Sequence, residues 1–193
     1  MTDPMVPTEW LAGRLSDRDV QIIDATWYMP GENRPGRGEF EAGHIPGSVF
    51  FDIDALSDPT SGLPHMLLSP EPFAEAAGAL GLRRDATQII YDGQGLFSAP
   101  RVWWTLKVMG FERVFVLDGG LVKWKAEGRE ISTGPDAPVA TVVTPGFDPD
   151  LVRNVDEVRE ALSDGHTQLI DARPPGRFSG EVPEPRAGLR GGH

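Results

Sequence analysis

Cysteine is absent from this 193-residue chain. Its absence excludes disulfides, cysteine-ligated zinc, iron–sulfur clusters and any thiol nucleophile within these residues. Basic residues are also scarce, because 18 Lys and Arg stand against 29 Asp and Glu, for a net charge of −11. A chain this acidic lacks the clustered cations that bind a phosphate backbone, so we expect no nucleic-acid partner.

Long apolar runs are missing as well. No stretch approaches the roughly 20 residues that cross a bilayer, and the opening MTDPMVPTEW lacks the basic and apolar regions of a signal peptide. We therefore expect a cytoplasmic protein without a membrane partner. The apolar content of 39% is ordinary for a globular protein, and the length fits one domain or slightly more.

Strand-like and helix-like segments alternate along the first part of the chain. The β-branched and apolar runs predict strands at 20–24, 48–53, 87–92 and 113–118. The amphipathic segments predict helices at 8–15 with Thr8 as the cap, from the pair Ser69-Pro70 onward, at 99–109 and at 121–128, and the segment 29–47 predicts a long ordered loop. This alternation indicates an α/β domain with a mainly parallel sheet.

An internal repeat is the most informative feature of the sequence. LSDRDVQIIDA at 15–25 matches LSDGHTQLIDA at 162–172 at seven of eleven positions. After a small shift, Gly43-His44 corresponds to Gly192-His193. The chain therefore begins a second copy of its opening unit.

The repeat predicts the domain organisation. We expect an N-terminal domain at 1–130, a proline-rich linker at 131–151 and an incomplete second domain at 152–193. In the second domain, Asn154 and Glu157 have the spacing of a capping box, and a strand should follow at 167–172. One helix and one strand are too little to close a core, so we expect a truncated two-domain protein.

The segment YDGQGLFSAPR (91–101) predicts a strand, a glycine-containing turn and the start of a helix. Backbone N–H groups converge in such a turn and can hold an anion or stabilise a thiolate at the strand end. Asp92 stands at that position, and its carboxylate would repel an anion. A dinucleotide fingerprint is excluded, because Gly93 and Gly95 lack the third glycine. From the residues alone, an ordinary strand-to-helix turn is the simpler interpretation.

Several segments together carry a resemblance to a known family. They are GHIPG (43–47), FFDIDALSD (50–58), LPHML (63–67), YDGQGLFSAPRVWW (91–104) and VLDGGLVKW (116–124). These resemble the N-terminal domain of the tandem-domain sulfurtransferases of the rhodanese family. The segment IDARPPGRFSGEVPEPRAGLRGGH (170–193) is similar to the opening of the family's C-terminal domain. Within the family, FDIDALSD, PHML and the arginines of the last segment favour the 3-mercaptopyruvate type over the thiosulfate type.

The resemblance implies a rhodanese-like three-layer fold, with two tandem domains of which only the second is catalytic. In that second domain, a loop cysteine takes sulfur from 3-mercaptopyruvate as a persulfide, pyruvate leaves, and a thiol or cyanide acceptor takes the sulfur without a cofactor. The partners implied are thus a small-molecule sulfur donor and a thiol acceptor. Asp92 stands at the equivalent strand end of the first domain and forms no persulfide. Because the nucleophilic cysteine is absent, we expect the 193-residue chain to be inactive.

Two arginines match the family's substrate-binding residues. Arg177 and Arg186 would hold the carboxylate of a mercaptopyruvate-like substrate, since a guanidinium binds a carboxylate through two parallel hydrogen bonds. The alternative is that they are exposed loop arginines that pair with Glu181 or Glu184.

Asp54 and His65 match first-domain residues that the family is proposed to use for proton transfer with a serine of the catalytic loop. An imidazole oriented by a carboxylate suits such a relay. The alternative for His65 is a surface histidine in a proline-flanked loop. We expect His44 to be structural, with its ring bonded to a backbone group. None of His44, His65 and His166 has metal-ligand spacing, so no metal is expected.

The sequence is also compatible with a second class of function that is not enzymatic. A lone rhodanese-like domain can act as a non-catalytic module that binds a protein or an anion. The sequence does not distinguish this module from the sulfurtransferase, and it does not indicate an oligomeric state.

Overall fold

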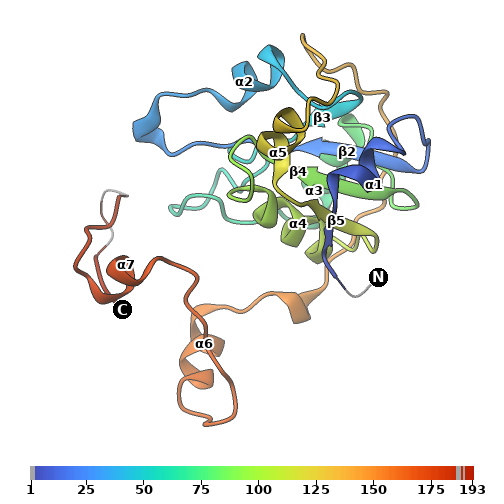
Figure 1. Cartoon of the computed structure of the whole chain (residues 1–193). Coiled ribbons are helices and arrows are strands. Elements are labelled where there is room, and N and C mark those ends of the chain that lie inside the picture. Colours follow the sequence, from blue (N-terminus) through green and yellow to red (C-terminus); the bar gives the residue numbers. More distant parts are fainter. Residues whose placement is uncertain (1–2, 186–187, 189) are drawn as a thin grey trace. The chain divides into compact units, whose positions relative to one another are not determined.

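The computed structural model describes residues 3–185, 188 and 190–193, and the chain divides into two compact units between Val152 and Arg153 (Figure 1). The first unit is built on a five-stranded sheet in the order β1-β5-β4-β2-β3, with every neighbouring pair parallel. The predicted α/β fold with a parallel sheet is therefore confirmed. The strands are β1 (Met5–Val6), β2 (Val20–Asp24), β3 (Ser48–Phe50), β4 (Thr87–Tyr91) and β5 (Val114–Leu117).

Helices cover both faces of this sheet. They are α1 (Thr8–Ala12), α2 (Gly36–Ala42), α3 (Pro70–Ala79), α4 (Ala99–Val108) and α5 (Gly120–Ala126), with the short 3-10 turns η1 (Pro30–Glu32) and η2 (Pro149–Leu151). The helix predicted from Ser69-Pro70 onward begins at Pro70, and those predicted over 99–109 and 121–128 form with ends within one or two residues of the prediction.

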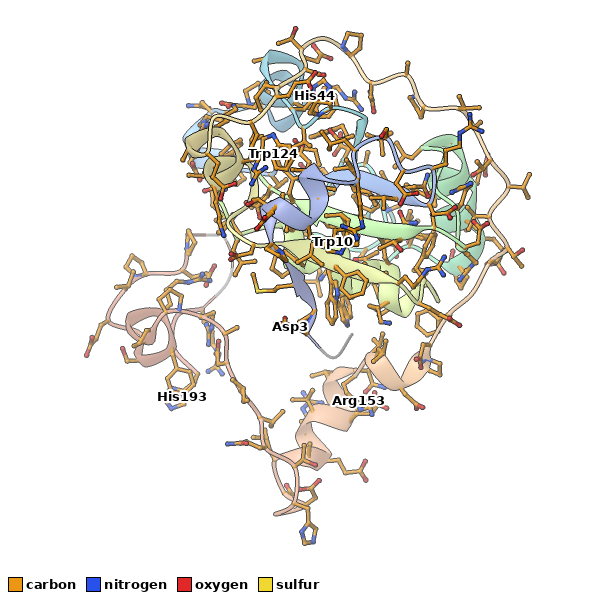
Figure 2. The ribbon with its side chains drawn as sticks, turned by 45° about the vertical axis from the view of Figure 1, so that its right-hand side comes forward. Asp3, Trp10, His44, Trp124, Arg153 and His193 are labelled. Atoms are coloured by element: carbon orange, nitrogen blue, oxygen red, sulfur yellow. The ribbon has the colours of Figure 1, made fainter. Side chains whose placement is uncertain are left out.

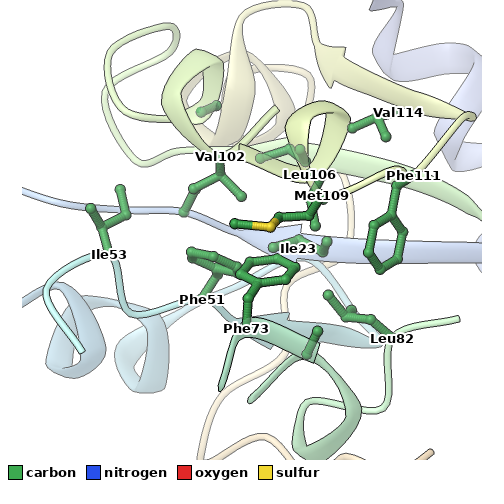
Figure 3. Close-up of a cluster of buried hydrophobic side chains, with 14 of the residues drawn as sticks. Ile23, Phe51, Ile53, Phe73, Leu82, Val102, Leu106, Met109, Phe111 and Val114 are labelled. Carbon is green, nitrogen blue, oxygen red and sulfur yellow. The ribbon is translucent and has the colours of Figure 1, made fainter. Parts of the chain in front are cut away.

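Successive residues of each central strand pack on opposite faces, as the pleat requires. Ile23 and Ile90 join a cluster with side chains of α3 and α4 (Figure 3). Ile22 and Ile89 join a second cluster with side chains of α1 and α5, where the indole of Trp124 is buried (Figure 2). Burial on both faces explains why these strands are continuously apolar.

Two local predictions in this unit are wrong. The segment 29–47 is not a loop throughout, because it contains η1 and α2. The side chain of Phe40 anchors α2 in the core at 1% exposure, a tertiary contact that outweighs the two glycines of the helix. Thr8 is not a cap either: Pro7 precedes the helix, and the Thr8 hydroxyl donates a hydrogen bond to Glu127 at 2.7 Å.

Residues 131–151 run along the first unit and are grouped with it. Asp136 accepts hydrogen bonds from the backbone N–H of Phe50 at 3.0 Å and from the side chain of Arg37 at 3.1 Å. Further along, the Thr141 hydroxyl donates to the carbonyl of Leu82 at 2.6 Å. These bonds hold the proline-rich segment against the sheet edge and the loop that follows α3.

The second unit contains α6 (Val155–Ala161) and α7 (Pro175–Ser179). The predicted capping box is confirmed: Asn154 accepts from the N–H groups at the start of α6, and Glu157 accepts from the N–H of Asn154 at 2.6 Å. The predicted strand at 167–172 is wrong, since the described residues of this unit contain no strand. An isolated extended segment has no neighbour that completes its backbone hydrogen bonds.

Candidate functional site at the carboxyl edge of the sheet

Strands β2 and β4 end side by side at the carboxyl edge of the sheet. The partner of β2 on its other side is β3, and the partner of β4 on its other side is β5. Parallel sheets bind ligands in the crevice at such a switch point. Asp24 ends β2 and Asp92 directly follows β4, so both strands bring a buried carboxylate to this edge.

The loop after β4 is organised around the carboxylate of Asp92, which is 0% exposed. Its Oδ2 accepts hydrogen bonds from the backbone N–H groups of Phe97, Ser98 and Ala99 at 2.7, 2.9 and 2.9 Å, and its Oδ1 accepts from Gln94 at 2.9 Å. The carboxylate also faces the start of α4, where the helix dipole stabilises negative charge. The N–H groups of this turn therefore converge on an anion, and that anion is the carboxylate of Asp92 itself.

A second polar cluster joins Asp54 and His65, which the sequence placed eleven residues apart. The Nε2–H of His65 donates to Oδ1 of Asp54 at 2.7 Å. The indole of Trp27 donates to both oxygens of the same carboxylate at 3.0 and 3.2 Å, and its ring meets the imidazole edge-on at 5.0 Å. His65 adopts a φ of 57°, rare for a residue other than glycine, and Arg101 donates to its carbonyl. Trp27 and Arg101 were not singled out by the sequence.

Trp27 connects this cluster to the Asp92 loop. Its ring stacks near that of Phe97, with centroids 6.3 Å apart, and its carbonyl accepts from the side chain of Gln94 at 3.0 Å. The side chains of Asp54 and His65 are 67% and 20% exposed. The edge of the sheet thus carries an imidazole–carboxylate pair, with an exposed carboxylate and a partly buried imidazole, that can hold or transfer a proton. It lies beside the loop whose N–H groups hold Asp92.

The substrate-binding residues predicted in the second unit are described only in part. Arg177, in α7, pairs with Glu184 at 2.5 Å, and the Glu184 side chain is 6% exposed. This is the ion pair that the sequence offered as the alternative to substrate binding. Arg186 lies outside the described residues. The role of both arginines in substrate binding stays a prediction.

His44 contacts Phe40, and an equivalent contact occurs in the second copy of the repeat. Its Nδ1–H donates to the carbonyl of Phe40 at 2.9 Å, and the two rings stack at 4.0 Å. In the second unit, His193 donates to the carbonyl of Phe178 at 3.1 Å, and those rings stack at 4.4 Å. His44 is 5% exposed and bonds a backbone group, as expected for a structural histidine.

No helix in the described part of the chain is long and apolar enough to cross a membrane. Among the same residues, no three or more His, Cys, Asp or Glu side chains gather in a way that would hold a metal ion.

The chain is similar in sequence to proteins of a known family. A family model for the rhodanese-like domain matches residues 7–127. The chain is 47% identical to 3-mercaptopyruvate sulfurtransferase of Escherichia coli K12, over 97% of this chain and 67% of that protein. It is 41% identical to thiosulfate/3-mercaptopyruvate sulfurtransferase 1, mitochondrial, of Arabidopsis thaliana, over 100% of this chain and 56% of that protein.

Among solved structures, the crystal structure of the 3-mercaptopyruvate sulfotransferase SseA from Escherichia coli is similar to the chain, with a TM-score of 0.90 and 44% identity. The match covers 100% of this chain and 72% of that one. The chain thus spans a little over half to two thirds of the length of the curated relatives named above.

Proposed function

Because the chain belongs to the rhodanese family, we propose that it serves sulfur transfer from 3-mercaptopyruvate, with thiosulfate as the alternative donor, to a thiol or cyanide acceptor. The observation that carries the proposal is the Asp54–His65 pair beside the Asp92 loop. The names of the relatives support the same chemistry. We expect the protein in the cytoplasm, although the Arabidopsis relative is named as mitochondrial.

The reaction needs a thiolate and a proton donor. The thiolate attacks the mercapto sulfur, the C–S bond of the substrate breaks, and its electron pair remains on the carbon as the enolate of pyruvate. The enolate then takes a proton to become pyruvate, and the sulfur stays on the enzyme as a persulfide until an acceptor thiolate removes it. In this proposal, His65 supplies or relays that proton and Asp54 orients its ring.

The two parts of the chain have different tasks in this scheme. Residues 1–130 form a domain that makes no persulfide, because Asp92 occupies the position of the thiol. Residues 152–193 supply Arg177 and Arg186, which bind the substrate carboxylate. When the substrate binds, the ion pair between Arg177 and Glu184 breaks and the substrate carboxylate takes the place of Glu184. The thiol itself is not among these 193 residues.

The alternative of a module that binds a free anion at the 92–99 loop has less support. The backbone N–H groups of that loop already bond to Asp92, and a second anion there would meet its charge at close range. A module that binds another protein remains the second candidate, favoured by the exposed side chains of Leu63, Met66, Leu96 and Phe97 in the loops of this edge.

Two measurements test the proposal. The 193-residue chain should release no pyruvate from 3-mercaptopyruvate above the blank. A chimaera that continues the chain with the remaining C-terminal sequence of the Escherichia coli relative should release pyruvate. In that chimaera, His65→Gln should lower kcat by about 100-fold, and Arg177→Met should raise KM about tenfold or more.

The exposed His166 offers a matched control, because His166→Gln should leave both constants unchanged. Pyruvate release by the 193-residue chain alone would contradict the proposal. A folded, active chimaera whose kcat is unaffected by His65→Gln would remove His65 from the mechanism.

A further inference from the structure

A small cavity lies where β2 and β4 end, and neither Asp54 nor His65 lines it. Its volume is about 120 Å³, well below the roughly 300 Å³ at which sites for larger ligands begin. It therefore suits a molecule of a few heavy atoms. Asp24 and Thr26 line its buried end, and Arg34 and Lys125 line its exposed end.

Asp24 brings an incompletely bonded carboxylate to this cavity. The residue is 0% exposed, and its Oδ1 accepts from the backbone N–H of Thr26 at 2.8 Å. No described residue donates a hydrogen bond to Oδ2 within 3.5 Å, and the hydroxyls of Thr26 and Tyr91 offset its burial only in part. A buried carboxylate oxygen without a donor is unfavourable, and a bound cationic group would relieve it.

In the second copy of the repeat, the corresponding carboxylate has a cationic partner, although its side chain is 29% exposed. Asp171 corresponds to Asp24, and its Oδ1 accepts from the backbone N–H of Arg173 at 2.8 Å, in the same turn. There the guanidinium of Arg173 also bonds both carboxylate oxygens, at 2.6 to 3.1 Å. In the first copy, Thr26 replaces that arginine, and its hydroxyl instead accepts from the N–H of Gly93 at 2.8 Å. Asp24 therefore lacks the cation that its counterpart has.

The exposed end of the cavity carries the opposite charge. Arg34 is neutralised by Glu39, at 2.8 Å, and lies over the ring of Tyr28. Lys125 forms no ion pair or hydrogen bond with any residue that the structure describes through its ammonium group. The carboxylate at the buried end thus has no cation against it. The ammonium at the exposed end has no carboxylate in direct contact among the described residues, and only the charge of Glu39 acts on it at longer range.

We propose that this cavity binds a small zwitterion, with an ammonium or guanidinium group on Asp24 and a carboxylate on Lys125. The class is that of a small amino acid or guanidino acid. 3-Mercaptopyruvate and thiosulfate contain no cationic group, so this site is independent of the proposed sulfur transfer.

Titration of the 15N-labelled chain with glycine and with guanidinoacetate tests the site. Both probes should shift the amide signals of Thr26 and Gly93, and at least one should bind with a Kd of about 1 mM or lower. Ethylammonium and acetate, which each carry half of the charge pattern, should bind about tenfold more weakly.

Three variants assign the contacts. Asp24→Asn keeps the side-chain shape and should weaken binding of the tighter-binding probe about tenfold or more. Lys125→Gln should weaken binding of the same probe several-fold. Lys107→Gln, on α4, is the matched control and should leave Kd unchanged. If Asp24→Asn does not fold, the exposed Lys125→Gln variant carries the test.

Two results would overturn the proposal. One is the absence of any amide shift with either zwitterion up to about 20 mM, well above the expected Kd. The other is binding of acetate as tight as that of the zwitterions, unchanged by the Lys125 and Asp24 variants. Neither result bears on sulfur transfer, which the chimaera tests separately.

Discussion

The Oδ2 atom of Asp92 lies 2.9 Å from the backbone nitrogen of Ala99, the first residue of α4. The residue that follows a central strand thereby holds the start of the next helix. Such a ring of N–H groups is also what lowers the pKa of a thiol and stabilises a thiolate. In this domain the same geometry therefore serves stability, because the group at its centre is a carboxylate.

Replacing Asp92 should destabilise the first unit. Asp92→Ala leaves several buried N–H groups without an acceptor, so we expect the free energy of unfolding to fall by about 3 kcal/mol or more. Urea denaturation followed by tryptophan fluorescence measures the change. The exposed Asp85→Ala variant is the control and should stay within about 0.5 kcal/mol of the parent. A loss of that small size for Asp92→Ala would show that the loop is held by other contacts.

A cysteine at the same position should be acidic. In Asp92→Cys the N–H groups and the start of α4 face the sulfur, so its thiol pKa should lie at least about one unit below the ordinary 8.5. Thiolate absorbance against pH measures the value, and no other cysteine in the chain interferes. Ser16→Cys, at an exposed turn, provides the reference thiol. Equal pKa values for the two thiols would falsify this reading of the loop.

The buried Asp24 should make stability depend on pH. Burial raises the pKa of its carboxyl above 3.8, and the charge of Asp92 adds to this rise, while the neighbouring hydroxyls of Thr26 and Tyr91 lower it in part. The folded protein therefore holds this proton more tightly than the unfolded chain. The contribution of Asp24 to the free energy of unfolding decreases as pH rises from about 4 to the raised pKa.

Asp24→Asn removes this dependence. The free energy of unfolding of the variant, minus that of the parent, should increase as pH rises above about 4 and then level off. Urea denaturation at a series of pH values measures the difference, with the exposed Asp85→Asn as the matched substitution. A difference that falls with pH would mean that the carboxylate is stabilised in the folded state.

Asp171 should show the opposite shift. The guanidinium of Arg173, helped by the backbone N–H of the same residue, lowers the pKa of Asp171 to about 2. Arg173→Gln should return it toward 3.8. Carbon-13 NMR titration of the carboxyl group measures both values, with Arg159→Gln as a control in the same unit. A pKa near 2 in the Arg173 variant as well would exclude the ion pair as its cause.

The segment 131–151 should protect the edge of the sheet. Asp136→Ala removes the acceptor of the Phe50 N–H, so hydrogen exchange at that amide should speed up by about tenfold. The amide of Ala25, which bonds to the carbonyl of Tyr91 at 2.8 Å, should exchange as before. Unchanged exchange at Phe50 would show that the segment does not hold this edge.

The central strands were predictable because the local pattern and the tertiary environment agree. Residues 20–24 form β2 over the whole predicted range, since a β-branched run suits a strand that is buried on both faces. The capping box at Asn154 was predictable for the same reason, as all of its atoms lie within four residues.

Predictions were wrong where a distant partner decides the outcome. The helix α2 contains two glycines and depends on the burial of Phe40. The run at 167–172 repeats β2 closely in sequence, yet it forms no strand, because no neighbouring strand pairs with it among the described residues of its unit. Local propensity is a weak determinant of secondary structure when a strand needs a pairing partner, or when a helix packs on residues that are distant in the chain.

By itself, the sequence determined the absence of thiol chemistry in these residues, the alternating α/β order and the family resemblance, because each depends only on which residues occur and in what order. Only the tertiary structure decided the state of the individual carboxylates. It filled the loop cradle with Asp92, joined Asp54 to Trp27 as well as to His65, and buried Asp24 completely while its repeat counterpart Asp171 is 29% exposed. Burial and hydrogen bonding are supplied by segments distant in the chain, so identical residues in matching sequence acquire different chemistry.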